Sequence, residues 1–287
     1  MPHNFRERLI RLHHCGNMSW KGIYTLLKTD PGLYSLNNCP SKNKIPQATE
    51  TIADFHSHQI HENIKQYSKL GIQIITFFDS IYPSMLKEIY QPPWVLYAKG
   101  DLSLLQKQRK LAVVGSRNAT VYSKEVIKAI MKELVEERVV IVSGLAKGVD
   151  TIAHLTADEH NGKTIAVIAG GFNHIYPKEN LLLAETIKES HLLLSEYPPD
   201  TKPLKWHFPM RNRIISGISR GTLVVEAKRK SGSLITANLA LQEGRDVFAV
   251  PGSIFSPNSY GANDLIKQGA KPVSSASDII EEWEFYS

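Results

Sequence analysis

Cysteine is scarce in this chain, because its 287 residues include only Cys15 and Cys39, which stand far apart. Without a second pair, neither a disulfide framework nor a CxxC metal site is available, and both residues are expected to be ordinary thiols. No stretch approaches the roughly 18 apolar residues of a membrane span. The first residues, MPHNFRERLIRLHHCGN, lack the apolar core of a secretory signal. We therefore expect a cytoplasmic protein without a membrane anchor.

The motifs of several enzyme and metal sites are missing as well. Gly115 is followed by Ser, Arg and Asn, so the GxGxxG turn of a dinucleotide site is absent and no cofactor is expected. No serine stands in the GxSxG elbow of a hydrolase. His56, His58 and His61 form an HxHxxH spacing, but positions 56 and 58 of a helix point apart and no acidic or cysteine ligand is grouped with them. No metal site is expected there.

The net charge is positive. The chain carries a formal charge of +6 at neutral pH and a pI near 9.1. Such a balance suits a polyanionic partner, because each neutralised phosphate releases counterions from a nucleic acid. Composition alone is weak evidence, since many basic proteins bind no nucleic acid.

From about residue 111 onward, short apolar runs alternate with amphipathic stretches of helical length. This alternation is typical of βαβ units and a parallel sheet. The runs are apolar without alternation, which predicts strands covered by helices on both faces. We therefore predict an α/β fold with a doubly wound, mostly parallel sheet. The predicted strands are LAVVG (111–115), VVIVSG (139–144), TIAVIAG (164–170), LLLSEY (192–197), TLVVEA (222–227) and DVFAVPG (246–252).

The first seventy residues have a different pattern. They contain short helical stretches broken by Gly, Pro and Asn, and no convincing strand. Residues 71–100 contain strand-like runs that we expect to join the edge of the sheet. The pattern predicts a small helical domain at 1–70 and a larger α/β domain at 71–287.

Ligands of an open parallel sheet bind outside the carboxyl ends of the strands, so the loops at those ends are the segments of interest. The first predicted strand ends at Gly115, and Ser116 and Arg117 follow it. Glycine permits close approach of a backbone, the serine can cap the next helix, and the arginine suits phosphate. The alternative is a tight turn with a solvated arginine.

The loop after the third predicted strand contains Gly170 and Gly171, followed by Lys178 and Asn180 in the stretch IYPKEN. Pro177 is expected to begin a helix and to place Lys178 in its first turn. A cation there opposes the helix dipole, which an anion bound between them would relieve. The alternative is an exposed lysine that is merely solvated.

The loop after the fourth predicted strand holds the densest basic and aromatic cluster, with Lys202, Lys205, Trp206, His207 and Phe208 ahead of Arg211, Asn212 and Arg213. Arginine for phosphate and aromatic rings for base stacking are the ingredients of single-strand binding. The two arginines could equally pair with acids such as Glu196 or Glu226, and some of the rings could cap the core.

After the fifth predicted strand, the segment Lys228-Arg229-Lys230-Ser231-Gly232-Ser233 leads into a helix. Ser231 and Ser233, with free amides at the helix N-terminus, form a second candidate phosphate cradle. Four loops at one edge of the sheet thus supply Arg, Lys, Gly and Ser, and none supplies a catalytic pair. No catalytic residue is therefore expected.

Read together, these segments resemble the DprA/Smf family. The resemblance covers about residues 82 to 273, and the matching segments follow in order along the chain. They are YPSMLKEI, PPWVLYAKGD, LAVVGSRNAT, VSGLAKGVDTIAH, GG with IYPKEN, LLSEYPP, FPMRNRIISGIS, VVEAKRKSGSLITANLALQEGRDVFAVPG and GANDLIKQGA.

The resemblance implies an extended Rossmann-like domain preceded by a SAM-like or helix-hairpin-helix-like domain. It implies a non-enzymatic protein that binds and protects single-stranded DNA and loads the RecA recombinase onto it during natural transformation and homologous recombination. It also implies a homodimer. By the same resemblance Arg117 and Lys178 line the DNA pocket, and the stretch Arg211 to Arg213 has mixed structural and DNA-facing roles. The winged helix that some members carry at the C-terminus is not expected here.

Two alternatives remain open. The first is a nucleotide-processing enzyme resembling the LOG phosphoribohydrolases, because Gly221, Thr222 and Glu226 superficially match the second half of a PGGxGTxxE motif. The spacing is one residue too long and no PGG precedes it. The second is a protein-interaction adaptor whose basic loops meet an acidic partner.

Overall fold

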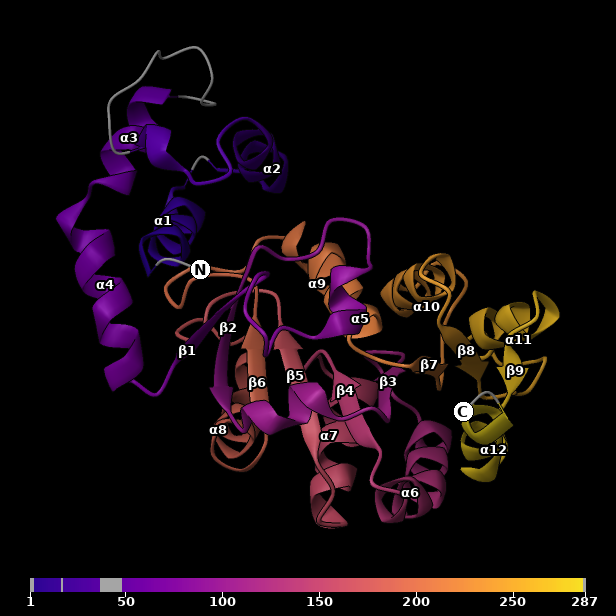
Figure 1. Cartoon of the computed structure of the whole chain (residues 1–287). Coiled ribbons are helices and arrows are strands. Elements are labelled where there is room, and N and C mark those ends of the chain that lie inside the picture. The colour runs from indigo at the N-terminus through magenta and orange to yellow at the C-terminus, as the bar shows by residue number, and fades with distance from the viewer. Residues whose placement is uncertain (1–2, 17, 37–47, 286–287) are drawn as a thin grey trace. The chain divides into compact units, whose positions relative to one another are not determined.

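The computed structural model describes residues 3–16, 18–36 and 48–285, so Cys39 lies outside the described residues. The chain divides into two compact units (Figure 1). The first extends to Tyr82 and includes Gln91–Ala98, and the second comprises Pro83–Tyr90 and the chain from Lys99 onward. Cys15 is a buried free thiol of the first unit.

The first unit is mainly helical, which confirms the predicted helical N-terminal region. Its two strands pair antiparallel, with Gln73 opposite Ala98 and Thr76 opposite Val95. The predicted domain boundary at residue 70 stays a prediction. The elements are α1 (His3–His14), α2 (Trp20–Thr29), η1 (Tyr34–Leu36), α3 (Ala48–Phe55), α4 (His58–Lys69), β1 (Gln73–Thr76) and β2 (Val95–Gly100), whose last residues belong to the second unit.

The second unit contains a parallel sheet with the strand order β6-β5-β4-β3-β7-β8-β9. Each predicted run overlaps one of the strands β3 to β8, whereas β9 was not predicted, and the mostly parallel α/β fold is confirmed. The strands are β3 (Lys110–Val114), β4 (Val140–Ser143), β5 (Thr164–Ile168), β6 (Leu192–Ser195), β7 (Gly221–Val224), β8 (Asp246–Ala249) and β9 (Lys271–Pro272).

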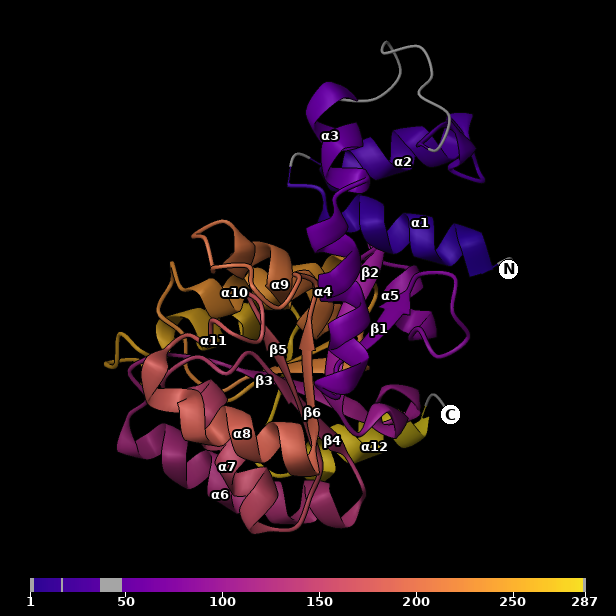
Figure 2. The ribbon, with the colours of Figure 1, turned by 90° about the vertical axis from the view of Figure 1, so that its left-hand side faces the viewer.

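Helices cover both faces of this sheet, with α6, α7 and α8 on one face and α9 and α10 on the other (Figures 1 and 2). This arrangement is the doubly wound one predicted from the uninterrupted apolar strands. The helices and 3₁₀ turns of this unit are α5 (Ser84–Lys87), η2 (Leu102–Gln106), α6 (Val121–Glu136), α7 (Val149–Glu159), η3 (Lys178–Asn180), α8 (Leu181–Ser190), α9 (His207–Gly217), α10 (Gly232–Gln242), α11 (Tyr260–Lys267) and α12 (Ser277–Phe285).

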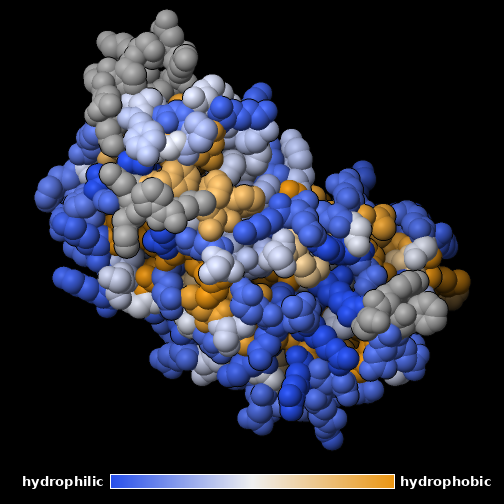
Figure 3. Space-filling view, viewed as in Figure 1, coloured by the Kyte–Doolittle hydropathy of each residue, from blue (hydrophilic) through white to orange (hydrophobic). Residues whose placement is uncertain are grey.

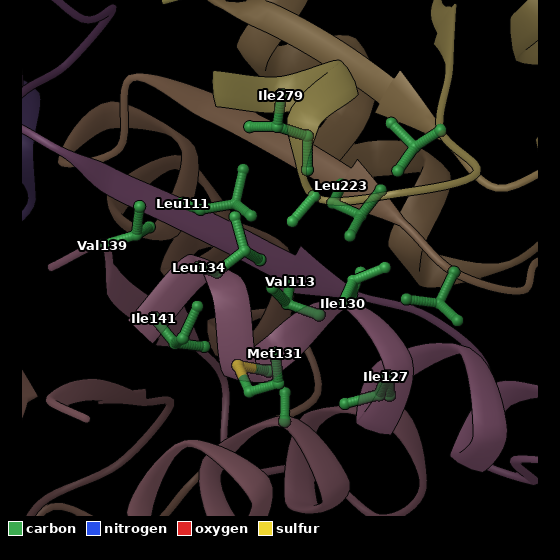
Figure 4. Close-up of a cluster of buried hydrophobic side chains, with 14 of the residues drawn as sticks. Leu111, Val113, Ile127, Ile130, Met131, Leu134, Val139, Ile141, Leu223 and Ile279 are labelled. Atoms are coloured by element: carbon green, nitrogen blue, oxygen red, sulfur yellow. The ribbon is translucent and has the colours of Figure 1, made fainter. Parts of the chain in front are cut away.

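The core beneath β3 shows how the pattern of apolar residues specifies this packing. Helix α6 places Ile127, Ile130, Met131 and Leu134 on one face, as a spacing of three and four residues dictates. These side chains pack against apolar residues of β3, β4 and β7 (Figure 4). All four side chains are at most 4% exposed. Strand β3 is therefore held in place by a closely packed core.

The strand order determines where a ligand can bind. From β3 the chain runs outward through β4, β5 and β6, then returns to place β7 on the other side of β3. Successive crossovers therefore diverge between β3 and β7. In open α/β sheets the crevice at such a switch point, outside the carboxyl ends of the strands, is the usual binding site.

In the part of the chain that the structure describes, no helix is both long and apolar enough to cross a membrane. The visible surface is mostly hydrophilic, with hydrophobic residues in separate small patches (Figure 3). The described residues also include no cluster of three or more His, Cys, Asp or Glu side chains able to hold a metal ion.

Candidate nucleic-acid interface

A pocket of about 850 Å³ opens at the switch point between β3 and β7. The loops after these two strands, the beginnings of α7 and α10, and α9 all contribute to it. Of the twelve predicted site residues it brings seven together, namely Gly115, Ser116, Arg117, Arg211, Asn212, Ser231 and Ser233. Segments up to 120 residues apart in sequence thus meet around one cavity.

The loop after β3 is held tightly against the start of α7. The carbonyl of Ser116 accepts a hydrogen bond from the amide of Val149 at 3.1 Å, and the Ser116 hydroxyl accepts one from the amide of Asn118. A Cβ atom on Gly115 would lie 2.6 Å from the Val149 side chain, so only glycine fits there. This turn presents Arg117, which is exposed, toward the pocket.

Two aromatic rings line the pocket on the same side as Arg117. The guanidinium carbon of Arg117 lies 5.8 Å from the centre of the Phe208 ring, and Tyr176 meets that ring edge to face at 5.8 Å. Tyr176 is 55% exposed. Phe208 is half-buried. A planar cation beside an exposed ring and a half-buried one offers both a phosphate contact and a stacking surface.

The loop after β7 forms the opposite rim. Lys228 and Lys230 are exposed there and line the pocket. The hydroxyls of Ser231 and Ser233 are 2.6 Å apart at the beginning of α10. A Cβ atom on Gly232 would meet nothing within 4 Å. There is therefore room for a ligand beside Gly232 at this helix N-terminus, an end that favours anions.

Two charged side chains that line the pocket, Arg211 and Asp150, are buried, and we call this pair the floor of the pocket. They are 5% and 7% exposed. Nη1 of Arg211 donates to the carbonyl of Val167 at 2.9 Å, and burial lowers the pKa of this arginine to about 10. Oδ2 of Asp150 accepts from the amide of Gly144 at 3.0 Å, and burial raises the pKa of the carboxyl.

Cations dominate the pocket. Arg117, Lys205, Arg211, Lys228 and Lys230 line it, and the lining includes one acid. The described lining residues include no histidine or cysteine, and Asp150 is their one carboxylate. The arrangement is suited to holding a polyanion with planar groups.

Five predicted site residues lie outside this pocket. Gly170 and Gly171 pack against Thr201, Pro203 and the Pro198–Pro199 carbonyls, where a Cβ atom would meet backbone within 3.1 Å. Lys178 is exposed in η3 and does not line the pocket.

The other two residues outside it are buried and hydrogen-bonded. Nδ2 of Asn180 donates to the carbonyl of Leu145 and to the hydroxyl of Thr151, both at 2.8 Å. Asn180 also lines a smaller cavity of about 350 Å³, which shares Arg117 with the main pocket. Nη2 of Arg213 forms a buried ion pair with Glu196 at 2.5 Å. That pairing is one of the alternatives that the sequence left open.

Some pocket residues were absent from the predicted set. Lys205, Phe208, Lys228 and Lys230 stand in segments that the sequence had singled out, beside residues that were chosen. Asp150 was missed, because an acid in the first turn of a predicted helix ordinarily indicates favourable interaction with the helix dipole. Its position on the floor depends on contacts across the fold, which sequence spacing does not reveal.

The three residues that superficially match the phosphoribohydrolase motif have other roles in the structure. Gly221 and Thr222 lie within β7 and are buried. The carboxylate of Glu226 accepts hydrogen bonds from the hydroxyls of Thr120 and Ser123 at the start of α6. Glu226 does not line the pocket, so the likeness to the phosphoribohydrolase motif has no counterpart in the site.

Comparison with known proteins identifies the family of the chain. The family model of DNA recombination-mediator protein A matches residues 73–284. The chain is 50% identical over 263 residues to DNA processing protein DprA of Bacillus subtilis, covering 92% of this chain and 88% of the relative. It is 51% identical over 210 residues to DprA of Streptococcus pneumoniae, covering 73% and 74%.

Solved structures give the same relationship. The crystal structure of DprA from Streptococcus pneumoniae superposes with a TM-score of 0.84 at 40% identity, covering 96% of this chain and 97% of that one. A Helicobacter pylori DprA structure, described as showing a single-stranded DNA binding mode of that protein, has a TM-score of 0.67 at 33% identity, covering 74% and 95%. With most of its length matched in both sequence and fold, the chain belongs to the DprA/Smf family of DNA recombination-mediator proteins.

Proposed function

We propose that this protein binds single-stranded DNA in the charged pocket and acts there as a recombination mediator. The observation that carries the proposal is the convergence of five cations, from three loops and helix α9, on one cavity that contains a single acid. Scattered surface lysines would give a general positive charge, whereas this arrangement concentrates it at one site. Such a concentration favours a polyanion through counterion release.

The exposed cations at the rim are the expected phosphate contacts. Arg117, with a planar guanidinium, suits a phosphate oxygen pair, and Lys205, Lys228 and Lys230 add point charges around it. Phosphate contacts position a strand without reading its sequence. Preference among sequences should therefore be slight, and affinity should fall as salt rises.

A single strand should bind better than a duplex. The pocket is recessed, and its aromatic side chains, Tyr176 and Phe208, can stack only on bases that are unpaired. In a duplex those bases are stacked and paired with the other strand. The single-strand binding described for the Helicobacter pylori relative supports this preference.

For the predicted site residues outside the pocket we propose supporting roles. Gly170, Gly171, Asn180 and Arg213 would shape the loops that carry the contacts, while Lys178 would meet the strand as it leaves the cavity. We further propose a cytoplasmic homodimer that loads RecA onto the bound strand and has no catalytic activity of its own. The helical domain at 1–70 and the α/β domain at 71–287 remain our proposed division of the chain.

Substitution of the two arginines that flank β3 tests the proposal. Arg117 follows the carboxyl end of this strand at the pocket, and Arg109 precedes its amino end, where it pairs with Glu137 at 3.0 Å. Fluorescence anisotropy with labelled oligo-dT should show that Arg117→Ala weakens binding at least about tenfold, as loss of a charge-assisted contact implies. Arg109→Ala should bind like wild type. Equal effects of the two changes would remove the support for this pocket.

A further inference from the structure

Trp206 is a large aromatic residue that lies on the surface of the protein. It is 58% exposed, whereas Trp94 and Trp283 are at most 8% exposed. It occupies the N-cap position of α9 and does not line the pocket. Two residues close to it in the sequence, Lys205 and Phe208, do line the pocket. Trp206 therefore lies beside the rim of the pocket, on the outside.

Two other rings support the indole of Trp206. The centre of the His207 ring lies 4.1 Å from that of the indole and the centre of the Tyr197 ring lies 6.3 Å from it, at interplanar angles of 86° and 80°. His207 is buried and stacks on Tyr197 at 3.9 Å. Because both neighbours meet the indole nearly at right angles, neither stacks flat on it. The indole is therefore supported by packed rings while more than half of its surface stays exposed.

The segment that precedes Trp206 is held in place by backbone hydrogen bonds. The amide of Gly171 donates to the carbonyl of Thr201 at 2.8 Å, and the amide of Asn173 donates to the carbonyl of Pro199 at 3.0 Å. A ring that is already fixed loses little conformational entropy when a ligand stacks on it. The surface of Trp206 is therefore preorganised for binding a flat group.

The charge around Trp206 is positive. Lys202 and Lys205 are exposed in the same segment, and the acid of this segment, Asp200, accepts a hydrogen bond from Nδ2 of Asn173 at 2.6 Å. Cations for phosphates and an aromatic face for bases are the two components of a surface that binds a single strand. Beside a pocket for which we propose DNA binding, this combination favours an unpaired strand over an apolar partner protein.

We propose that Trp206 forms a second contact with the bound strand, outside the pocket, where one base stacks on the indole and Lys202 contacts a neighbouring phosphate. The inference rests on the proposed binding of single-stranded DNA and adds a path for the strand. One end of the strand leaves the pocket past Lys205 and continues over the beginning of α9. A flat indole can stack on any base, so this contact discriminates little among sequences.

The length of the oligonucleotide separates this contact from those of the pocket. We would measure the affinity of oligo-dT strands of increasing length by fluorescence anisotropy, using wild type and Trp206→Ala. Strands that only fill the pocket should bind both proteins equally. Strands long enough to reach Trp206 should bind wild type at least about fivefold more tightly, the lower end of what base–aromatic stacking contributes. Trp206→Phe keeps a ring and should recover most of this difference.

A single abasic position in a long strand identifies the stacked base. At one position outside the pocket, removal of the base should weaken binding to wild type several-fold and leave binding to Trp206→Ala unchanged, because the two changes remove the same contact. Phe255→Ala is the control. Phe255 is 86% exposed in the loop after β8 and does not line the pocket. This variant should show the same dependence on length and on the abasic position as wild type.

The outcomes distinguish this inference from the proposed function. If Trp206→Ala binds every length as tightly as wild type while Arg117→Ala weakens binding, single-strand binding stands, the stacking contact is overturned, and the exposed ring is left for a partner protein. The contact is also overturned if Trp206→Ala weakens the shortest strands as much as the longest, or if Phe255→Ala gives the same loss. If wild type binds no strand, the proposed function fails and this inference fails with it.

Discussion

At the scale of single residues, the site depends on a close approach between Gly144 and Arg211. A methyl group on Gly144 would occupy the position of the guanidinium, 1.5 Å from Nη1. We expect Gly144→Ala to displace Arg211 from the floor, lower the free energy of unfolding by about 1–3 kcal/mol as overpacking does, and weaken oligonucleotide binding. Denaturant unfolding and anisotropy measure the two effects.

Gly16→Ala is a suitable control for this prediction. A Cβ atom on Gly16 would meet nothing within 4 Å, so surface substitution there should change the free energy of unfolding by at most about 0.5 kcal/mol. If Gly144→Ala is as stable as Gly16→Ala and binds normally, Arg211 does not occupy the position described here.

His154 makes the stability of the α/β unit depend on pH. Its Nδ1 donates to the hydroxyl of Thr164 at 2.6 Å, its Nε2 is buried without a partner, and burial lowers its pKa from 6.5 to about 3. Between these two pKa values the unfolded chain binds the extra proton and the folded one does not, so stability falls as the pH falls below 6.5.

His154→Asn preserves a donor to Thr164 and removes the titration. From pH 7 to pH 5 we expect wild type to lose about 2 kcal/mol more of its free energy of unfolding than this variant loses. Urea unfolding at both pH values measures the difference. Parallel losses in the two proteins would show that His154 is not held neutral by burial.

Whether a site residue could be predicted from the sequence depends on what determines its position in the fold. Arg117 and Ser231 occupy loops directly after predicted strands, so the edge of a parallel sheet brings them together. Arg211 was chosen as part of a basic and aromatic cluster and by the family resemblance, but its place on the floor depends on the path of α9. Asp150 was missed because its contacts with Gly144 and Ala146 arise from the turn before α7.

At the scale of elements, the beginning of α10 offers a direct comparison of neighbouring cations. Lys230 lines the pocket, whereas Arg229 binds Asp264 at 2.8 Å and does not line it. Lys230→Ala should weaken binding and reduce the slope of log affinity against log salt by about 0.7, the value for one phosphate contact of a single strand. The measurement is a set of anisotropy titrations at several salt concentrations.

Arg229→Ala is expected to leave the slope unchanged. Both variants remove one positive charge, so a contribution of net charge alone would shift them equally. An equal shift would therefore contradict a specific role for the pocket-facing lysine.

Strands β3 to β8 were predictable because their runs are almost entirely apolar, as in LAVV and TIAVI. Strand β9 was not predicted, because its two residues, Lys271 and Pro272, form no apolar run. The helical pattern before residue 70 was equally clear. β1 and β2 were recognised as strand-like, but their antiparallel pairing was not, because pairing depends on register and not on composition. The order β6-β5-β4-β3-β7-β8-β9 likewise comes from crossovers that the run of elements alone does not specify.

At the scale of the whole molecule, the proposed homodimer would carry two pockets. A DNA strand long enough to reach both pockets should bind more tightly than its larger number of binding positions alone would predict. The gain could be as much as about 100-fold, because the second contact becomes intramolecular. Titrations with oligo-dT of increasing length, beside sedimentation of the free protein, test this. A monomer whose affinity grows only in proportion to length would contradict the dimer proposal.

The central claim is that unpaired DNA is bound in the pocket at the β3–β7 switch point. The most direct test is competition between labelled oligo-dT and unlabelled duplex of equal length, with salt varied, using wild type and Arg117→Ala. We predict that the single strand binds more tightly than the duplex at every salt concentration and that its affinity falls as salt rises. Arg117→Ala should weaken single-strand binding at least about tenfold. Equal affinity for duplex and single strand at moderate salt would contradict the account.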